Sequence, residues 1–129
     1  MEAQDILKLE TGTKEVQSLS PKKVKIVKVT VETVIDKNGK TVGDKAVCEV
    51  KHPDKEETVS ISSVEYRKGK EIKTSGLWVS LDEDGNIRKG SALATFKDFF
   101  NAKTLKELEG KEEIPTTEDD KGYLCFKAY

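Results

Sequence analysis

The chain has 129 residues, a length that fits one domain whose core needs no disulfide or metal to hold it together. Charged residues make up 36% of the sequence and hydrophobic residues 35%, so we expect a thin core under a heavily charged surface. The 23 basic and 24 acidic residues give a formal charge of −1, which argues against strong non-specific binding to nucleic acid by the chain as a whole.

The charge is unevenly distributed, however. Residues 21–80 hold 13 Lys/Arg against 9 Asp/Glu, a net charge of +4, whereas residues 81–129 hold 8 against 11, a net charge of −3. A local basic surface is therefore expected only in the first of these two segments.

Cysteine spacing and hydropathy indicate where the protein resides. Cys48 and Cys125 have no neighbouring Cys or His at ligand spacing, which argues against a zinc site and against a secreted disulfide framework. The sequence contains no apolar run near the length of a membrane span, and its mixed polar start does not resemble a signal peptide. These features predict a soluble cytoplasmic protein with no membrane partner, no metal and no cofactor.

Residues 1–20 show no sustained period and are expected to form a loosely ordered arm before a single domain over residues 21–129. Residues 22–35 are crowded with β-branched side chains and predict a long first strand. Its apolar positions change phase partway: Val24 and Ile26 share one face, whereas Val27, Val29 and Val31 share the other. The strand must therefore bend or bulge if both sets are to be buried.

A hairpin turn is expected at Asn38-Gly39, the strongest short hairpin signal in the chain. A second strand follows over residues 41–51, and Pro53 ends it because proline cannot donate to a ladder. The adjoining His52 is expected to lie in a surface turn. Residues 58–66 predict a third strand with a similar shift of phase, and residues 67–70 predict another turn.

A fourth strand, over residues 77–81, carries the only tryptophan. Strict alternation places Leu77, Val79 and Leu81 on one face and Trp78 on the other, beside small residues. A flat ring on a face of Gly and Ser, in a region rich in Lys and Arg, is typical of a surface that stacks a base. The alternative is that Trp78 packs under the following helix, since tryptophan is often largely buried.

The C-terminal part predicts a helix over about residues 91–100, in which Ser91 is the N-cap and Leu93, Phe96 and Phe100 form one apolar stripe. Thr104 and Glu107 form a capping-box pair that opens a short second helix. A last hairpin is expected from residues 111–114 and 122–128. The fold class is therefore mainly β, with some α: a small barrel or a curved antiparallel sheet with one helix packed on it.

This order of elements resembles small OB-fold-like proteins of phages and archaea that are implicated in binding single-stranded nucleic acid. The resemblance is carried by residues 91–129, which include the helix with Phe96 and Phe100, the segment LKELEGKE and the terminal GYLCFKAY. It implies an OB-like β domain and a single-stranded nucleic-acid partner, and it supplies no catalytic residue.

No residue set in the sequence predicts a reaction. The acidic run at residues 82–84 lacks the alternate ligand positions of a calcium loop, and the sequence contains no phosphate-binding glycine motif. His52 has no recognisable nucleophile nearby. A non-enzymatic role is expected.

The leading hypothesis is a binding module that holds single-stranded DNA or RNA by base stacking and a local basic face. The candidate residues are Trp78, Tyr66, Arg67, Lys68, Lys70, Lys73, Lys25 and Lys28. The alternative is a protein–protein adaptor or a viral or structural component, without nucleic-acid binding, that presents an edge strand or the Phe99 region to a protein partner or to a second copy. On that alternative the lysines only solvate strand edges and prevent edge-to-edge association.

Overall fold

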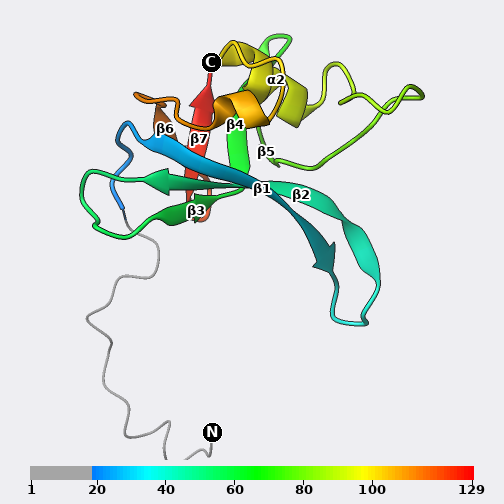
Figure 1. The fold of residues 1–129 in the computed structure, drawn as a ribbon, viewed down its shortest axis with the longest axis horizontal. Helices are drawn as coiled ribbons and strands as arrows, with labels where there is room; N and C mark the ends of the chain where they lie inside the picture. Colours follow the sequence, from blue (N-terminus) through cyan, green and yellow to red (C-terminus); the bar gives the residue numbers. More distant parts are fainter. Residues whose placement is uncertain (1–18) are drawn as a thin grey trace, which may run out of the picture.

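The structure is a computed structural model that describes residues 19–129, so most of the arm expected over residues 1–20 lies outside the described residues. Two sheets form the body of this part of the chain (Figure 1). The first sheet has the order β1 (Lys25–Ile35), β2 (Thr41–Lys51) and β3 (Val59–Ile61). The second has the order β5 (Glu71–Gly76), β4 (Ser63–Lys68), β7 (Leu124–Ala128) and β6 (Thr116–Glu118). Between β5 and β6 lie the helix α2 (Ala92–Phe99) and the 3₁₀ turn η1 (Lys106–Leu108).

The expected fold class, mainly β with one helix, is confirmed, although the two described sheets do not close into a barrel. One pairing differs from the antiparallel sheet expected from the sequence, because β4 and β7 run parallel. Parallel neighbours need a long crossover between them, and here the chain passes through β5, α2, η1 and β6 before it returns beside β4. In the described part of the chain no helix is long and apolar enough to cross a membrane.

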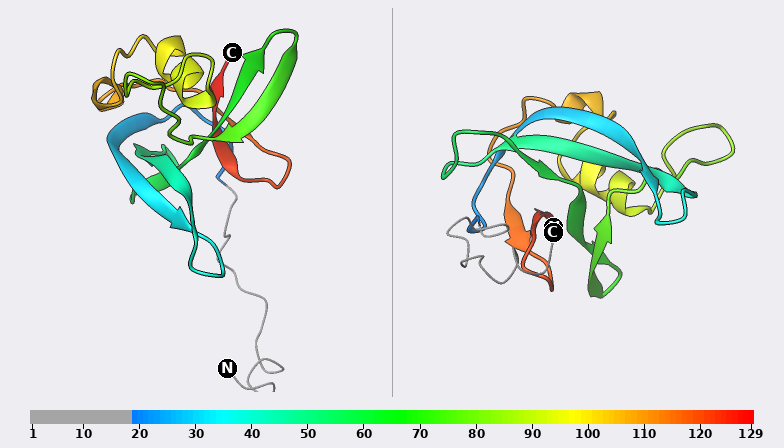
Figure 2. Two further views of the ribbon diagram at one scale, coloured as in Figure 1. Left: turned by 90° about the vertical axis from the view of Figure 1, so that its right-hand side faces the viewer. Right: turned by 90° about the horizontal axis from the view of Figure 1, so that it is seen from below.

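The predicted bend in β1 is confirmed. The register with β2 shifts between Ile26 and Lys28, so Ile26 and Val29 both face the core although they lie an odd number of residues apart. Of the second apolar set only Val29 packs against the core, because Val27, Val31 and Ile35 are exposed. The far half of the β1–β2 hairpin runs past the body of the molecule, as Figures 1 and 2 show, and none of residues 30–45 belongs to the core cluster.

The phase shift predicted in the third strand marks a change of sheet. The strand is interrupted at Ser62, so that β3 belongs to the first sheet and β4 to the second. Ile61 on β3 and Val64 on β4 are both fully buried, although they lie an odd number of residues apart. The break lets one continuous segment contribute apolar side chains to the core from two sheets.

The strand that follows begins earlier in the sequence than expected. β5 spans Glu71–Gly76, whereas residues 77–81 do not form a continuous strand. Within them Trp78 forms an isolated bridge to Lys45 of β2, and Leu81 forms one to Ile87. In this segment Leu77 accepts a hydrogen bond from the Ala46 N–H at 2.8 Å, and the Val79 N–H donates to Asp44 at 2.8 Å. The last hairpin is also shifted: it is formed by β6 and β7, and Ile114 instead bridges to Val24.

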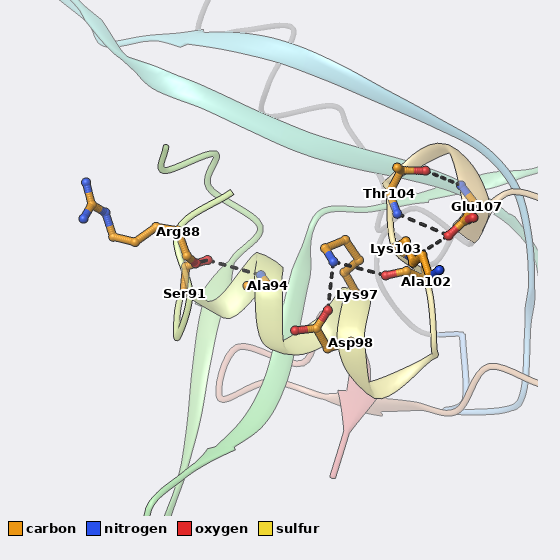
Figure 3. Close-up of polar contacts among 9 residues, drawn as sticks. All are labelled: Arg88, Ser91, Ala94, Lys97, Asp98, Ala102, Lys103, Thr104 and Glu107. Atoms are coloured by element: carbon orange, nitrogen blue, oxygen red, sulfur yellow. Dashed lines mark hydrogen bonds and ion pairs between the residues drawn. The ribbon is translucent and has the colours of Figure 1, made fainter. Parts of the chain in front are cut away.

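The core lies between the two sheets and α2, which covers one side of β4 and β7 (Figures 1 and 2). Phe96 of α2 stacks on Phe126 of β7, with ring centroids 4.6 Å apart, and meets Phe100 edge-on at 5.4 Å. The helix begins as predicted, because the Ser91 hydroxyl accepts a hydrogen bond from the Ala94 N–H at 3.2 Å (Figure 3).

The predicted capping box is confirmed, although the element it opens is a 3₁₀ turn. The Glu107 N–H donates to the Thr104 hydroxyl and the Thr104 N–H donates to the Glu107 carboxylate, each at 3.3 Å (Figure 3). Leu108 at the end of the turn is fully buried in the core.

The expectation of a surface histidine is wrong. His52 is fully buried, its Nε2 lies 2.8 Å from the carbonyl oxygen of Ser20, and its Nδ1 accepts from the Asp54 N–H at 3.0 Å. In this geometry Nδ1 is the acceptor and Nε2 faces the carbonyl oxygen as the donor. His52 therefore ties the start of the described chain to the turn after β2, a long-range contact that local sequence does not encode.

The two cysteines are free and buried, and their burial predicts unreactive thiols. Burial raises the pKa of Cys48 and of Cys125 from 9.0 to about 12, so neither forms the nucleophilic thiolate near neutral pH. We expect a thiol-specific disulfide reagent to leave both unmodified in the native protein and to label both after denaturation. Rapid labelling of the native protein would contradict this prediction.

The same shift predicts how stability depends on pH. A raised pKa favours the neutral thiol in the native state, so this contribution is complete below pH 9.0 and is lost as the pH rises from there towards about 12. Over that range the free energy of unfolding should fall as the pH rises, because the thiol loses its proton in the unfolded chain before it does so in the native protein. Urea unfolding should show a flatter alkaline decline in the Cys48→Ala and Cys125→Ala variants than in the unmodified chain.

Candidate nucleic-acid interface

Trp78 lies on the outer surface of the first sheet. It bridges to Lys45 of β2, so its indole is on the same face as the Lys45 side chain, while the neighbouring Leu77 points inward and is fully buried. Trp78 as a residue is 36% exposed and does not belong to the core cluster. It therefore does not pack under the helix, and part of its ring surface faces solvent.

Two glycines allow the indole to lie close against the backbone. A Cβ added to Gly43 would be 3.7 Å from Trp78 Cε3, and one added to Gly76 would be only 2.8 Å from Trp78 Nε1. No side chain at either position holds the ring away from the sheet. Packing the ring on both glycines fixes its orientation before any ligand binds, which lowers the entropy cost of stacking.

Lys45 gives this ring a positive neighbour. Its Nζ is 5.2 Å from the Trp78 ring centroid, within the range of a cation–π contact. A phosphate group beside a base stacked on the indole would lie within reach of this ammonium group. Lys45 was not among the residues predicted from the sequence, because its proximity to Trp78 depends on the bridge between β2 and the segment after β5.

We define the outer face as the solvent side of β1 and β2 together with Trp78. Lys28 is opposite Glu49 in the register and Glu32 is opposite Lys45, so all four side chains are on this face. Lys25 and Lys51 are also paired, across the bulge from Lys28. Four lysines against two glutamates give the outer face a mild positive charge, and Lys25 also forms a 3.7 Å ion pair with Glu112.

The predicted basic residues are divided between two places. Lys25 and Lys28 are on the outer face with Trp78. Arg67, Lys68, Lys70 and Lys73 are instead on the β4–β5 hairpin, which projects from the other sheet in a different direction (Figure 2). Lys70 is six residues from Gly76 along an extended strand, a distance of about 20 Å. Arg67, Lys68 and Lys70, towards the tip of the hairpin, therefore lie beyond the reach of a base stacked on Trp78, whereas Lys73 is only three residues from Gly76, about 10 Å along the strand.

Tyr66 cannot stack a base. Its side chain is only 7% exposed and belongs to the core cluster, where it shares a face of the second sheet with Val64. The sequence prediction for Tyr66 is corrected accordingly. The alternation of side chains after Ser62 did not show that the face carrying Tyr66 is the one that meets the core.

A hollow at the C-terminal end of α2 offers no comparable site. It is lined by Lys97, Asp98, Asn101, Ala102 and Lys103. The Lys97 ammonium group there already donates to Asp98 at 2.8 Å and to the carbonyl oxygen of Ala102 at 3.1 Å (Figure 3). Among residues 19–129 no group of three or more His, Cys, Asp or Glu side chains is placed to hold a metal ion.

The glycine contact gives a direct test of the Trp78 geometry. A methyl group at Gly76 would also come within 2.8 Å of Lys45 Cε, so Gly76→Ala must displace the indole, the lysine or both. Lys45 is flexible whereas the indole is rigid, and we expect the tryptophan emission to shift to longer wavelength as the ring becomes more hydrated. Gly85→Asn is the control for substituting a glycine far from the ring, because the added Cβ meets nothing within 4 Å and asparagine tolerates the left-handed backbone of Gly85, φ +80°, better than alanine does. An unchanged emission spectrum in Gly76→Ala would contradict the contact.

In comparisons with known proteins, no family model, no curated protein and no solved structure matches the chain.

Proposed function

We propose that the protein is a non-enzymatic module that binds single-stranded DNA or RNA on the outer face, with Trp78 as the stacking residue. The observation that carries the proposal is the partly exposed Trp78, whose indole packs against two glycines beside the Lys45 ammonium group. Single-strand binders combine these two elements, an aromatic surface for a base and positive charge for the backbone.

Stacking, rather than charge, supplies most of the affinity in this proposal. One base on an exposed aromatic ring contributes about 1–3 kcal/mol. The outer face has only two more lysines than glutamates, and each of Lys28 and Lys45 is opposite a glutamate in the register. We therefore expect weak binding with little sequence preference and a shallow dependence on salt.

A fluorescence titration with oligo-dT tests the proposal, because Trp78 is the only tryptophan and reports stacking directly. Binding should quench its emission. The logarithm of the association constant should fall with the logarithm of salt concentration with a slope of about −1 to −2, the value for neutralising about two phosphates of a single strand.

Duplex DNA serves as the matched control, because its bases are already stacked and cannot be placed on the indole. Quenching by the single strand and not by the duplex supports the proposal. Equal weak quenching by both, with a steep salt dependence, would indicate binding by charge alone and would contradict the role of Trp78. No quenching at low salt would overturn the proposal altogether.

A further inference from the structure

The outer edge of β1 is left unpaired over the second half of the strand, in the part of the chain that the structure describes. β1 is the outermost strand of its sheet, and its second half belongs to the projecting β1–β2 hairpin (Figure 1). Its exposed side chains there include Val31, which is 53% exposed, and Ile35, which is 59% exposed. Exposed β-branched residues on an open strand edge are a template for pairing with another strand.

Hydrogen bonds show which backbone groups this edge presents. The Val29 N–H points away from β2, because it donates to the Glu109 carboxylate at 3.0 Å. At the other end the Asp36 N–H points towards β2, because it donates to Lys40 at 2.9 Å. Backbone groups alternate along a strand, so those of Val31, Thr33 and Ile35 point outward like those of Val29. Within residues 19–129 no strand pairs with them.

The same contacts define the ends of the open stretch. Glu109 covers the edge at Val29, and the pKa of its carboxyl group is lowered by the hydrogen bonds from Lys106 and from the Val29 N–H. The turn at residues 36–40 leaves the sheet at the other end. The open stretch is therefore residues 31–35, long enough for one short strand.

The other described edges are protected in ways that this one is not. β3 and β6 have only three residues each, and short edge strands offer little to pair with. The edge strand β5 carries the charged residues Glu71 and Lys73. Residues 31–35 contain a single charge, Glu32, whose side chain lies opposite Lys45. Nothing in this stretch resists the addition of a strand.

We infer that this edge pairs with the same edge of a second copy of the chain, antiparallel and centred on Thr33. In this register Thr33 faces its symmetry mate and Val31 faces Ile35 of the other copy, so the outward backbone groups of both copies meet and exchange hydrogen bonds. All directly opposed outward pairs are then β-branched, and such cross-strand pairs stabilise a sheet. A two-fold pairing of this kind closes on itself and gives a dimer rather than a fibre.

Charge and blocking contacts exclude the neighbouring registers. Centring the pairing on Glu32 places two glutamates directly opposite each other, and centring it on Val34 places Glu32 opposite Asp36. Centring it on Val31 requires the Val29 N–H, which Glu109 already occupies. The register centred on Thr33 has neither defect, because Glu32 then lies opposite Val34. This self-complementarity identifies a second copy as the occupant of the edge.

The first test is the oligomeric state of the full chain by sedimentation velocity, from low micromolar to near-millimolar concentration. One short strand per copy buries little surface, so we expect a weak monomer–dimer equilibrium that shifts with concentration. A chain that stays monomeric over the whole range, as it would if another segment of the same chain covered the edge, overturns the inference.

Backbone and side-chain variants then test whether a dimer uses this edge. Thr33→Pro removes an outward N–H that makes no bond within the sheet, and proline is tolerated at such edge positions. We expect it to raise the dimer dissociation constant at least about tenfold. Thr33→Val loses the same hydroxyl contact with Asp44 but keeps the N–H, and it should dimerise normally. Equal dimerisation by both variants would place the interface elsewhere and overturn the inference.

A charge pair tests the register itself. Val31→Lys alone should weaken the dimer, because it places a lysine against Ile35 of the other copy. Adding Ile35→Glu should restore dimerisation by pairing opposite charges across the two-fold axis, whereas adding Ile35→Lys should not. Both positions are exposed on the projecting hairpin, so circular dichroism should show each variant folded. Failure of the opposite-charge pair to restore the dimer contradicts this register.

A cross-link provides an independent readout. The native Cys48 and Cys125 are buried, so Thr33→Cys introduces the one accessible thiol, and opposed residues in this register have Cα atoms within disulfide range. Mild oxidation should cross-link Thr33→Cys rapidly. Thr74→Cys, at an exposed position on the edge strand β5, should cross-link slowly. Equal rates for both variants would count against the inference.

Discussion

Replacing Phe96 by alanine should lower the free energy of unfolding by about 3–5 kcal/mol, the usual cost of removing a buried phenylalanine. Phe96 is fully buried and joins the helix to the second sheet through its stack on Phe126, while its edge contacts Phe100. The substitution would leave a cavity where α2 meets β7, and the surrounding strands can relax only in part. Urea unfolding followed by circular dichroism measures the loss.

Phe99 provides the matched control, because it is a phenylalanine on the same helix that is 46% exposed. Phe99→Ala should change the unfolding free energy by less than about 1 kcal/mol. If both variants lost similar stability, α2 would not be anchored through Phe96. A Phe96 variant as stable as the unmodified chain would contradict the stacked core.

Replacing Trp78 by alanine should weaken the binding of single-stranded oligonucleotides at least about tenfold, which corresponds to about 1.4 kcal/mol and lies within the value of one stacked base. The variant should lose far less stability than Phe96→Ala, because the indole lies outside the core cluster. Fluorescence anisotropy of a labelled oligo-dT measures the affinity without relying on the tryptophan that has been removed.

Tyr123→Ala is the control for the loss of an exposed aromatic ring. Tyr123 is exposed and lies in the loop that connects β6 to β7 of the second sheet. It should bind oligonucleotides as the unmodified chain does. Lys45→Gln should weaken binding by a smaller factor than Trp78→Ala and should make the salt dependence shallower. Unchanged affinity in Trp78→Ala, or a large loss of stability with binding intact, would remove the basis for the proposed function.

The segment around Trp78 shows what local sequence can predict about this site and what it cannot. Alternation along residues 77–81 correctly places Leu77 inward and Trp78 outward, because side chains of an extended segment point to opposite sides whatever it pairs with. The same rule fails at Leu81, which is exposed, because this segment does not form a continuous strand. The prediction for Tyr66 fails because alternation does not show which face of β4 meets the core, and that depends on what the second sheet packs against.

The composition of the candidate site required the tertiary structure. Lys45 and Gly43 come from β2, more than thirty residues before Trp78, and a single bridge brings them beside the indole. The sequence instead favoured the nearby Arg67, Lys68 and Lys70, which the β4–β5 hairpin carries away from the ring. Closeness along the chain was a poor guide here because a strand separates its two ends by about 3.3 Å per residue.

The sequence by itself determined the features that rest on local chemistry. These are the mainly β class, the Asn38-Gly39 hairpin, the bulge in β1, the Ser91 cap and the Thr104–Glu107 box. Each depends on residues within a few positions of one another, so the pattern of side chains is sufficient. Only the tertiary structure decided the parallel β4–β7 pairing, the burial of His52 and the open edge of the β1–β2 hairpin. These features depend on contacts between segments that are distant in the sequence. Such contacts are stabilised by apolar burial and by backbone hydrogen bonds, which many different side-chain patterns can form, so the sequence does not identify which segments pair.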